Sequence, residues 1–450
     1  MAKTTGGKAI RWIPTLRERK EITYMLPTML DNILDRTNLN EAYKQVVKNK
    51  GVAGVDGMTI DELWGYLAEN REAIISSIRD RTYKPQPVLR VEIPKPDGGK
   101  RLLGIPTVVD RVIQQAIAQV LTKVFDSQFS EYSYGFRPKR YAEMAIIQAL
   151  EYMNDGYDWM VDIDLERFFD TVNHDRLMNL ISRKVDDGDI ISLIRKYLVS
   201  GVRMNDEYKE TIIGTPQGGN LSPLLSNIML NELDEELESR GLRFVRYADD
   251  CIIMVRSEMA ARRVMRSVTS YIEEKLGLTV NTTKSKITKP NNPEMKFLGF
   301  GFFKDYQNQV YKAKPHQKSV HSFKYKLKQM TRKSWSVDTT YQVTRINQLI
   351  RGWVNYFKIG YMKSLLTRID SHTRVRLRMC IWKKWKTAKN RRKNLIKLGM
   401  NKYEAYKNSH TSKGAIRIAY SWVLTTTITN ERLSRFGLLT CMEQYNRVHI

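Results

Sequence analysis

Two adjacent carboxylates, Asp249 and Asp250, lie in a short polar break between two apolar runs rich in β-branched residues. Such runs on either side of a turn predict a β-hairpin with the acid pair at its tip. Adjacent carboxylates repel each other, so the tip favours a bound positive charge, and hard cations such as Mg²⁺ prefer carboxylate oxygens. An isolated Asp-Asp pair is more often a solvated turn, and the pair alone does not exclude that alternative.

A second acidic segment lies upstream, within residues 159–170. Its apolar residues alternate with acids, so that Asp162, Asp164 and Glu166 share one face of an extended strand. This pattern predicts a half-buried strand with an acidic face. A strand of this kind beside an acidic hairpin gathers many carboxylate oxygens, which favours a divalent metal site over a solvated turn.

Residues 247–250 (Tyr-Ala-Asp-Asp) resemble the catalytic signature of reverse transcriptases, and Asp164 with Phe169 five residues later resembles their first catalytic strand. Apart from the first twenty or so residues, the chain resembles the bacterial group II intron reverse transcriptase/maturases, in the compact subgroup without a C-terminal nuclease. The resemblance implies an RNA-directed DNA polymerase. In it, Asp164, Asp249 and Asp250 would hold two Mg²⁺ ions, for which Mn²⁺ can substitute. Asp162, one pleat from Asp164 on the same face, is the second choice for that position.

Residues 93–101 predict two strands joined by a Gly-rich turn, which present Lys95 and Arg101 as a basic clamp. A clamp of this kind neutralises the charge that develops on a leaving pyrophosphate. If this segment stood alone, we would interpret it as a solvated basic hairpin. With the acidic cluster downstream, we expect a site for the triphosphate of dNTPs.

Other motifs resemble those of the family in its own order. Gln217 lies in a Gly- and Pro-punctuated loop before an apolar helical run, and the resemblance places it against the incoming nucleotide and template. Lys284 corresponds to a cation on the nucleotide side. Arg137 corresponds to a contact with template or nucleotide. Residues 296–300 resemble the primer-grip turn.

Phe169 predicts which sugar is incorporated. A bulky ring beneath C2′ of the nucleotide leaves no room for a ribose 2′-hydroxyl, so we expect DNA rather than RNA synthesis. A plain core phenylalanine is the alternative, and it applies equally to Phe168.

The net charge of +27 is distributed unevenly along the chain. Residues 301–450 carry 32 Lys and Arg against 6 Asp and Glu, whereas the first 300 residues are nearly neutral. A solvated face usually mixes both signs, so an excess this one-sided indicates a nucleic-acid surface. Within it, residues 374–386 predict an intensely basic helix. Its expected phosphate contacts are Arg376, Arg378, Lys383, Lys384 and Lys386.

The fold class expected from the resemblance is an α+β right-hand polymerase with fingers, an antiparallel-sheet palm, a helical thumb and an N-terminal extension. The expected divisions are a basic tail (1–22), the extension (23–75), fingers (76–158), a palm with part of the fingers (159–310) and a basic thumb or maturase domain (311–450). In the extension, the Gly-rich segment 48–57 resembles the loop that covers the template strand in related enzymes.

Partners implied by the resemblance are an RNA template, a DNA primer, dNTPs and the group II intron RNA whose splicing and retrohoming the protein would assist. No apolar run reaches the roughly 18 residues of a membrane span. Three scattered cysteines give neither a disulfide framework nor zinc-ligand spacing, which fits a bacterial cytoplasm. Two alternatives remain open: an RNA-binding splicing maturase with little polymerase activity, and a related retron, diversity-generating or CRISPR-associated reverse transcriptase.

Overall fold

The computed structural model describes residues 28–94, 98–205 and 207–449. They form two compact units, one of residues 28–152 and 157–287 and the other of residues 153–156 and 288–449. The expected basic tail (1–22) and Lys95 of the expected clamp lie outside the described residues. The expected boundary between palm and thumb, at residues 310 and 311, falls within the second unit and stays a prediction.

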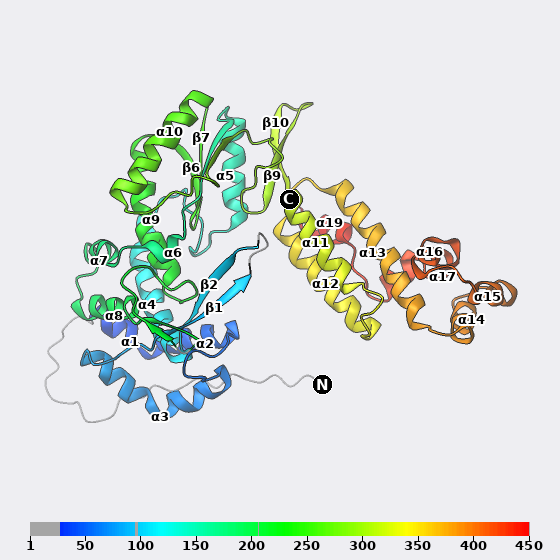
Figure 1. Cartoon of the computed structure of the whole chain (residues 1–450), viewed down its shortest axis with the longest axis horizontal. Coiled ribbons are helices and arrows are strands. Elements are labelled where there is room, and N and C mark those ends of the chain that lie inside the picture. The colour runs from blue at the N-terminus through cyan, green and yellow to red at the C-terminus, as the bar shows by residue number, and fades with distance from the viewer. Residues whose placement is uncertain (1–27, 95–97, 206, 450) are drawn as a thin grey trace. The chain divides into compact units, whose positions relative to one another are not determined.

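Helices form one end of the first unit around α4 (Val108–Phe125). Its apolar stripe is buried, and α1 (Met29–Leu34), α2 (Arg36–Asn49) and α3 (Ile60–Arg79) pack against it (Figure 1). The side chain of Thr28 caps α1 and that of Asp35 caps α2, since both accept bonds from first-turn amides.

A four-stranded sheet follows, with the strand order β2-β1-β4-β5. Its strands are β1 (Val88–Pro94), β2 (Lys100–Ile105), β4 (Val202–Met204) and β5 (Glu207–Lys209). The antiparallel pair β1 and β2 confirms the two strands predicted from residues 93–101.

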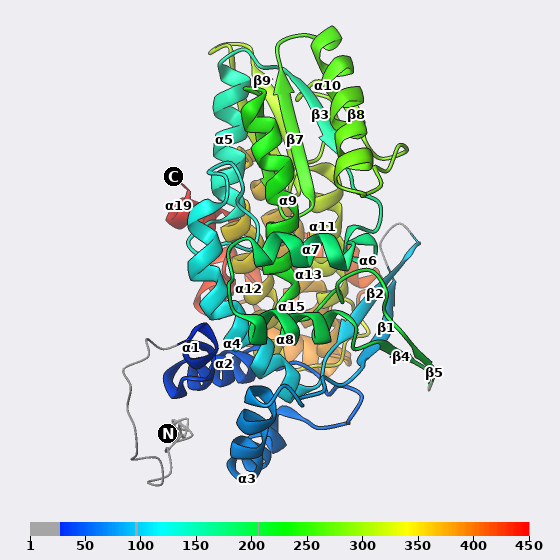
Figure 2. The same cartoon turned by 90° about the vertical axis from the view of Figure 1, so that its left-hand side faces the viewer.

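A second four-stranded sheet has the order β6-β7-β3-β8. Its strands are β3 (Trp159–Ile163), β6 (Arg243–Tyr247), β7 (Asp250–Val255) and β8 (Lys286–Thr288). Helix α10 (Glu258–Ser270) packs on β3 and β7, and α9 (Ser222–Ser239) packs on β6 (Figure 2). The predicted alternation is confirmed around Asp162, because Val161 and Ile163 are buried while Asp162 between them is only half-buried.

Shorter elements connect these layers. They are the 3₁₀ turn η1 (Asp126–Gln128), α5 (Ala142–Asn154), α6 (Phe168–Thr171), α7 (His174–Ser182), α8 (Gly188–Leu198) and the π-helical turn η2 (Tyr271–Lys275).

The second unit begins with an antiparallel ribbon of β9 (Phe300–Asp305) and β10 (Val310–Pro315) and continues as helices. The longer ones are α11 (Gln317–Met330), α12 (Thr339–Tyr356) and α13 (Lys363–Lys384). The shorter ones are α14 (Ala388–Lys397), α15 (Lys402–Ser409), α16 (Ala415–Tyr420), α17 (Trp422–Thr427), α18 (Asn430–Arg435) and α19 (Cys441–Val448). No helix within the described ranges is long and apolar enough to cross a membrane.

Helix α12 ends at Tyr356. The chain turns there because the amide of Gly360 bonds to the carbonyl of Phe357 at 2.8 Å and the amide of Tyr361 bonds to Ala313 of β10 at 2.8 Å. Two tryptophans pack within this unit, Trp382 buried and Trp353 half-buried. Trp353 stacks on Phe323 with ring centroids 4.4 Å apart, and Trp382 is 1% exposed.

Candidate active site

The predicted acidic hairpin is formed by β6 and β7. Their last paired residues are Tyr247 and Asp250, so Ala248 and Asp249 alone make the turn. Strand β3 lies on the other side of β7, with Ile163 opposite Cys251. The next pair in that register is Asp164 and Asp250. The backbone therefore brings Asp164 and the Asp249–Asp250 pair to the same end of the same sheet.

Carboxylates crowd one another at this end of the sheet. Burial raises the pKa of the Asp162 carboxyl to about 7, and the carboxylates of Asp250 and Asp164 add to the rise. The ammonium group of Lys286, on the neighbouring strand β8, opposes it. Like charges that disfavour ionisation in this way indicate an acidic concentration that a cation would relieve.

The donor set fits a hard divalent cation, since Asp164, Asp249 and Asp250 offer carboxylate oxygens from two adjacent chain segments. As the side chains lie here, no group of three or more acid, histidine or cysteine side chains within the described residues converges closely enough to hold an ion. The backbone arrangement thus brings the three carboxylates to one end of the sheet, and closing a ligand cage around an ion would require side-chain rotation.

A buried arginine supports the turn from below. Arg246 is 0% exposed and donates to both carboxylate oxygens of Asp234, on α9, at 2.7 and 2.5 Å. Its remaining nitrogen donates to the side chain of Asn227 at 3.0 Å and to the carbonyl of Ala248 at 2.9 Å. Ala248 has a φ of 57°, in the left-handed region that costs an L-residue about 1 kcal/mol. The bond to Arg246 holds this conformation.

Residues 134 and 135, shortly before Arg137, pack against the same turn. The amide of Tyr134 donates to the carbonyl of Arg246 at 2.8 Å, and Asn227 donates to the carbonyl of Gly135 at 2.8 Å. A Cβ atom at Gly135 would overlap the amide nitrogen of Ala248. Glycine is therefore required here for the close approach of two backbones.

The segment after η2 supports Asp164. The amide of Asn281 donates to the carbonyl of Asp164 at 2.8 Å, and the hydroxyl of Ser285 accepts from the Asp164 amide at 3.0 Å. Lys284 lies in the turn between these two residues and is exposed. Its position beside the acidic end of the sheet agrees with the expected role on the nucleotide side, which remains a prediction.

The predicted sugar gate and the predicted nucleotide loop are bonded to each other. The amide of Thr215 donates to the carbonyl of Phe169 at 2.6 Å, and the amide of Gly104, on β2, donates to the carbonyl of Gln217 at 2.7 Å. Gly214 has a φ of 90°, and a Cβ there would lie 2.9 Å from the carbonyl oxygen of Phe169. Loop 214–218 therefore connects the Phe169 turn with the first sheet.

An ion pair adds a second connection between the same two regions. Arg90 on β1 donates to the carboxylate of Asp170, the residue after Phe169, at 2.8 Å. Arg101, the described half of the expected clamp, is exposed on β2 opposite Ile93. Strands β1 and β2 thus both present basic side chains on the sheet that loop 214–218 contacts.

Arg137 requires a correction. It is 9% exposed, and all three of its guanidinium nitrogens donate within the protein, to the side chain and carbonyl of Asp126 and to the carbonyls of Ser130 and Ser133. These bonds give Arg137 a structural role in holding the segment before Gly135. The expected contact with template or nucleotide is therefore no longer proposed.

Three of the five basic side chains expected to contact RNA instead donate hydrogen bonds to other residues of the second unit. Arg376 donates to the hydroxyl and carbonyl of Thr331 at 2.7 and 3.0 Å. Arg378 is 5% exposed and donates to the carbonyl of Ile428 at 2.7 Å. Lys384 donates to the hydroxyl of Thr339 at 2.8 Å. The side chains of Lys383 and Lys386 are exposed, so these two remain candidates for phosphate contact.

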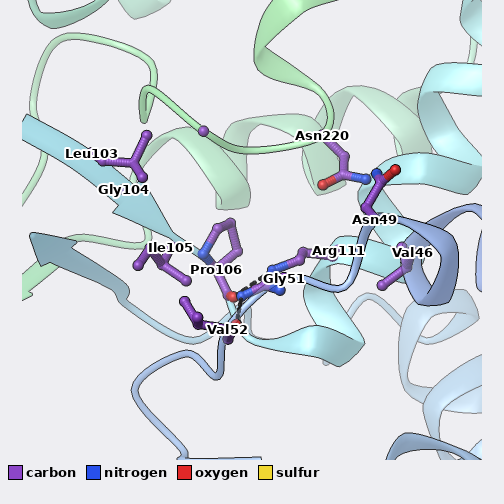
Figure 3. Close-up of a pocket in the computed structure, with 11 residues that line it drawn as sticks. Val46, Asn49, Gly51, Val52, Leu103, Gly104, Ile105, Pro106, Arg111 and Asn220 are labelled. Carbon is purple, nitrogen blue, oxygen red and sulfur yellow. Dashed lines mark hydrogen bonds between the residues drawn. The ribbon is translucent and has the colours of Figure 1, made fainter. Parts of the chain in front are cut away.

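The expected template-covering loop borders a cavity of about 250 Å³ in the first unit (Figure 3). Gly51 and Val52 line one side, β2 lines another, and Gly218 and Asn220 of the nucleotide loop line a third. Arg111 on α4 holds the loop, since it donates to the carbonyl of Val52 and, at 3.0 Å, to that of Pro106.

Sequence reasoning missed Arg246, Asp234, Lys286 and the Arg90–Asp170 pair. A signal for the first two was present. Arg246 interrupts an apolar strand at a core position, and Asp234 does the same in an apolar helix. Charges at two core positions predict a buried ion pair, although the sequence does not say which charges are partners.

Two family models match the chain. Residues 93–302 match "Reverse transcriptase (RNA-dependent DNA polymerase)", and residues 320–399 match "Group II intron, maturase-specific domain".

Two curated relatives are similar to this chain over more than half of its length. "Group II intron-encoded protein LtrA" of Lactococcus lactis subsp. cremoris is 32% identical over 324 residues, covering 58% of this chain and 54% of that protein. "Protein YkfC" of Escherichia coli (strain K12) is 32% identical over 301 residues, covering 58% of this chain and 79% of that protein. The chain thus spans about half the length of LtrA.

Among solved structures, a chain of a "Partial Cas6-RT-Cas1--Cas2 complex" aligns with 24% identity and a TM-score of 0.36, covering 58% of this chain and 46% of that chain. The low TM-score gives this match no weight.

Proposed function

The chain belongs to the family of group II intron-encoded reverse transcriptases, and from this membership we propose that it extends a DNA primer on an RNA template using dNTPs. The mixed sheet-and-helix fold is that of a right-hand polymerase. We propose in addition that the chain binds structured group II intron RNA and assists its splicing and retrohoming.

One observation carries the polymerase proposal. The register of β3 against β7 brings Asp164 to the end of the sheet where Asp249 and Asp250 form the hairpin turn. Structural aspartates rarely gather without cationic partners, because each added carboxylate makes ionisation of the others harder. Burial raises the pKa of Asp162 beside them, and the charges of Asp250 and Asp164 add to the rise.

Asp164, Asp249 and Asp250 would hold the divalent ions, Mg²⁺ or Mn²⁺ in its place. When bound, such ions activate the primer 3′-hydroxyl and neutralise charge on the departing pyrophosphate. The chain's own residues position the substrates. Lys95 and Arg101 would neutralise the triphosphate, Gln217 would lie against nucleotide and template, Lys284 would add positive charge on the nucleotide side, and Phe169 would exclude a 2′-hydroxyl.

RNA binding is proposed for the second unit, which contains most of the excess positive charge. Exposed Lys383 and Lys386 are suited to contact phosphates, and contacts of this type set affinity without selecting sequence. Structured RNA is recognised largely through shape and backbone, so a broad basic surface suits this partner. Segment 48–57 would cover the template strand at the cavity beside Val52.

A splicing maturase with little polymerase activity is the second candidate, and the match of residues 320–399 to a maturase-specific domain favours it as an accompanying activity. The carboxylates and the ordered support of the Ala248 turn argue against a chain that only binds RNA. The same maturase match favours the intron lineage over retron, diversity-generating or CRISPR-associated enzymes.

Primer extension on an RNA template tests the polymerase proposal. Asp164→Asn and Asp249→Asn remove one charge each without changing side-chain size, and we expect each to lower the extension rate on the order of 100-fold or more. Asp155→Asn, at an exposed turn, is the matched control and should extend like the parent chain.

Binding of a transcribed group II intron RNA, measured on the same variants, separates the two candidate activities. We expect the three variants to bind this RNA equally. If the parent chain binds intron RNA but extends no primer in Mg²⁺ or Mn²⁺, the maturase without polymerase activity is the correct assignment.

A further inference from the structure

The second unit contains a cavity of about 550 Å³ that the proposed polymerase and splicing activities leave without a role. Its lining residues come from α13, α16, α17 and α18 and the residues beside them. Helices α13 and α16 pack directly against each other (Figure 1). Polar side chains dominate the lining of the cavity: Arg374, Arg378, Tyr420, Thr425, Asn430 and Glu431. Its size is within the range typical of small-molecule sites.

Two arginines one helical turn apart face this cavity. Arg378 forms the buried floor, where its side chain is fixed by bonds to the carbonyl of Ile428 and, at 2.9 Å, to the side chain of Asn430. Arg374 is half-buried. Burial raises the pKa of the Asp370 carboxyl, one turn earlier on the same helix, and the charge of Arg374 opposes this rise, but the Asp370 oxygens accept from the amides of Cys441 and Met442. Like charges at this spacing destabilise a helix unless an anion lies between or above them.

The carboxylate of Glu431 does not neutralise them. It also borders the cavity, yet within the described ranges it forms no ion pair with Arg374 or Arg378. The polar end of the cavity therefore combines two guanidinium groups with hydroxyl and amide groups, the usual set of donors for a phosphate oxygen.

An aromatic ring stands at the rim. Tyr420 ends α16 and is 62% exposed, and Trp422, two residues later at the start of α17, is 54% exposed. A large exposed ring beside a basic cavity is the arrangement on which an unstacked base packs, since every base has a π-face.

From these contacts we propose that the cavity binds one unpaired nucleotide of a nucleic-acid strand. Its phosphate lies on Arg374 above the floor formed by Arg378, and its base stacks on Tyr420. Asn430 and Glu431 face the polar edge of the base. A base within a duplex is stacked on both sides and cannot enter, so the site selects single-stranded segments, bulges and loops.

Fluorescence anisotropy with the full chain tests this proposal, without dNTPs, so that a chain inactive as a polymerase would give the same answer. The probes are a labelled, unstructured RNA of roughly 12 nucleotides, the same sequence as a blunt RNA duplex, and its single-stranded DNA counterpart. The test variants are Arg374→Gln and Tyr420→Ala. The matched controls are Arg368→Gln, an exposed position on the same helix, and Tyr403→Ala, an exposed tyrosine on α15.

We expect each test variant to weaken binding of the single-stranded RNA about tenfold, while duplex binding changes less than about twofold. The controls should match the parent chain, and Tyr420→Phe should restore binding because it keeps the ring. Equal losses on RNA and DNA assign the site to phosphate and base, and a loss on RNA alone assigns it to the ribose as well. The proposal is overturned if the test variants match their controls, or if single-strand and duplex binding fall together.

Discussion

Arg246 and Asp234 form a fully buried ion pair, with side chains 1% and 0% exposed, directly beneath the turn that presents Asp249. The pair joins helix α9 to strand β6, and Arg246 extends it to the carbonyl of Ala248. A buried pair contributes little net stability but is costly to break, because the remaining charge has no partner. Its location indicates that it fixes the position of the turn.

Asp234→Asn should therefore lower the free energy of unfolding by about 3–5 kcal/mol, since it leaves the Arg246 guanidinium buried without a counter-charge. Urea denaturation followed by circular dichroism measures the change. Glu258→Gln breaks the exposed pair of Glu258 with Arg262 on α10 and should cost less than about 1 kcal/mol. Equal costs for the two variants would contradict the role given to the buried pair.

Gly135→Ala is expected to displace the turn with little effect on the rest of the fold. The added methyl group overlaps the Ala248 amide, so the hairpin tip has to move away. Primer extension should fall on the order of 100-fold, because small displacements of reacting groups cost that much. Gly65→Ala on α3, where a Cβ meets no atom within 4 Å, should leave extension unchanged and stabilise the helix by about 0.5–1 kcal/mol. A fully active Gly135→Ala chain would refute the close-approach argument.

A buried carboxyl in the first unit gives a pH dependence. Asp110 is 1% exposed, and burial raises its pKa above the usual range, although hydrogen bonds from Thr107 and Tyr83 oppose the rise. A raised folded-state pKa means that the unfolded chain loses its proton first as the pH increases. Stability from this group is then complete below the unfolded pKa of about 3.9 and declines as the pH rises toward the folded pKa.

The measurement compares the parent chain with Asp110→Asn, which cannot ionise. The parent chain's free energy of unfolding, relative to the variant, should fall by up to about 1.4 kcal/mol per pH unit above pH 4 and level off at the folded pKa. A difference between the two chains that stays constant with pH would show that Asp110 has an ordinary pKa in the folded protein.

The elements of the site were predictable where the signal is local. The hairpin around Asp249 and Asp250 and a strand within residues 159–170 follow from residue patterns that span only a few positions. The hairpin is confirmed, whereas the strand ends at Ile163, so Asp164 and Glu166 lie beyond it and not on its face. That Asp164 would meet Asp250 required the resemblance, since strands β3 and β7 are separated by almost ninety residues.

Long-range pairing explains what the sequence did not predict. Arg378 is one of many basic residues in a helix whose sequence predicts an exposed, charged surface. It is nevertheless buried, because Ile428 and Asn430, about fifty residues away, supply its hydrogen-bond acceptors. Arg137 and Lys384 differ from expectation for the same reason. A cation's role depends on which acceptors the tertiary fold brings to it, and charge patterning alone does not contain that information.

The carbonyl of Phe169 is held by loop 214–218, and its neighbour Asp170 is held by Arg90, so the ring is positioned from two sides. If the ring excludes the 2′-hydroxyl, Phe169→Val should raise incorporation of rNTPs relative to dNTPs by about 10- to 100-fold, within the range that loss of a few carbon atoms from a pocket produces. The ratio of the two kcat/KM values measures this, because it compares transition states on the same enzyme.

Phe168→Leu, at a position 2% exposed, is the control. It should cost less than about 1.5 kcal/mol of stability and leave the ratio unchanged, because the Phe168 ring packs in the core. A ratio that shifts with Phe168→Leu but not with Phe169→Val would show that Phe168, and not Phe169, excludes the 2′-hydroxyl.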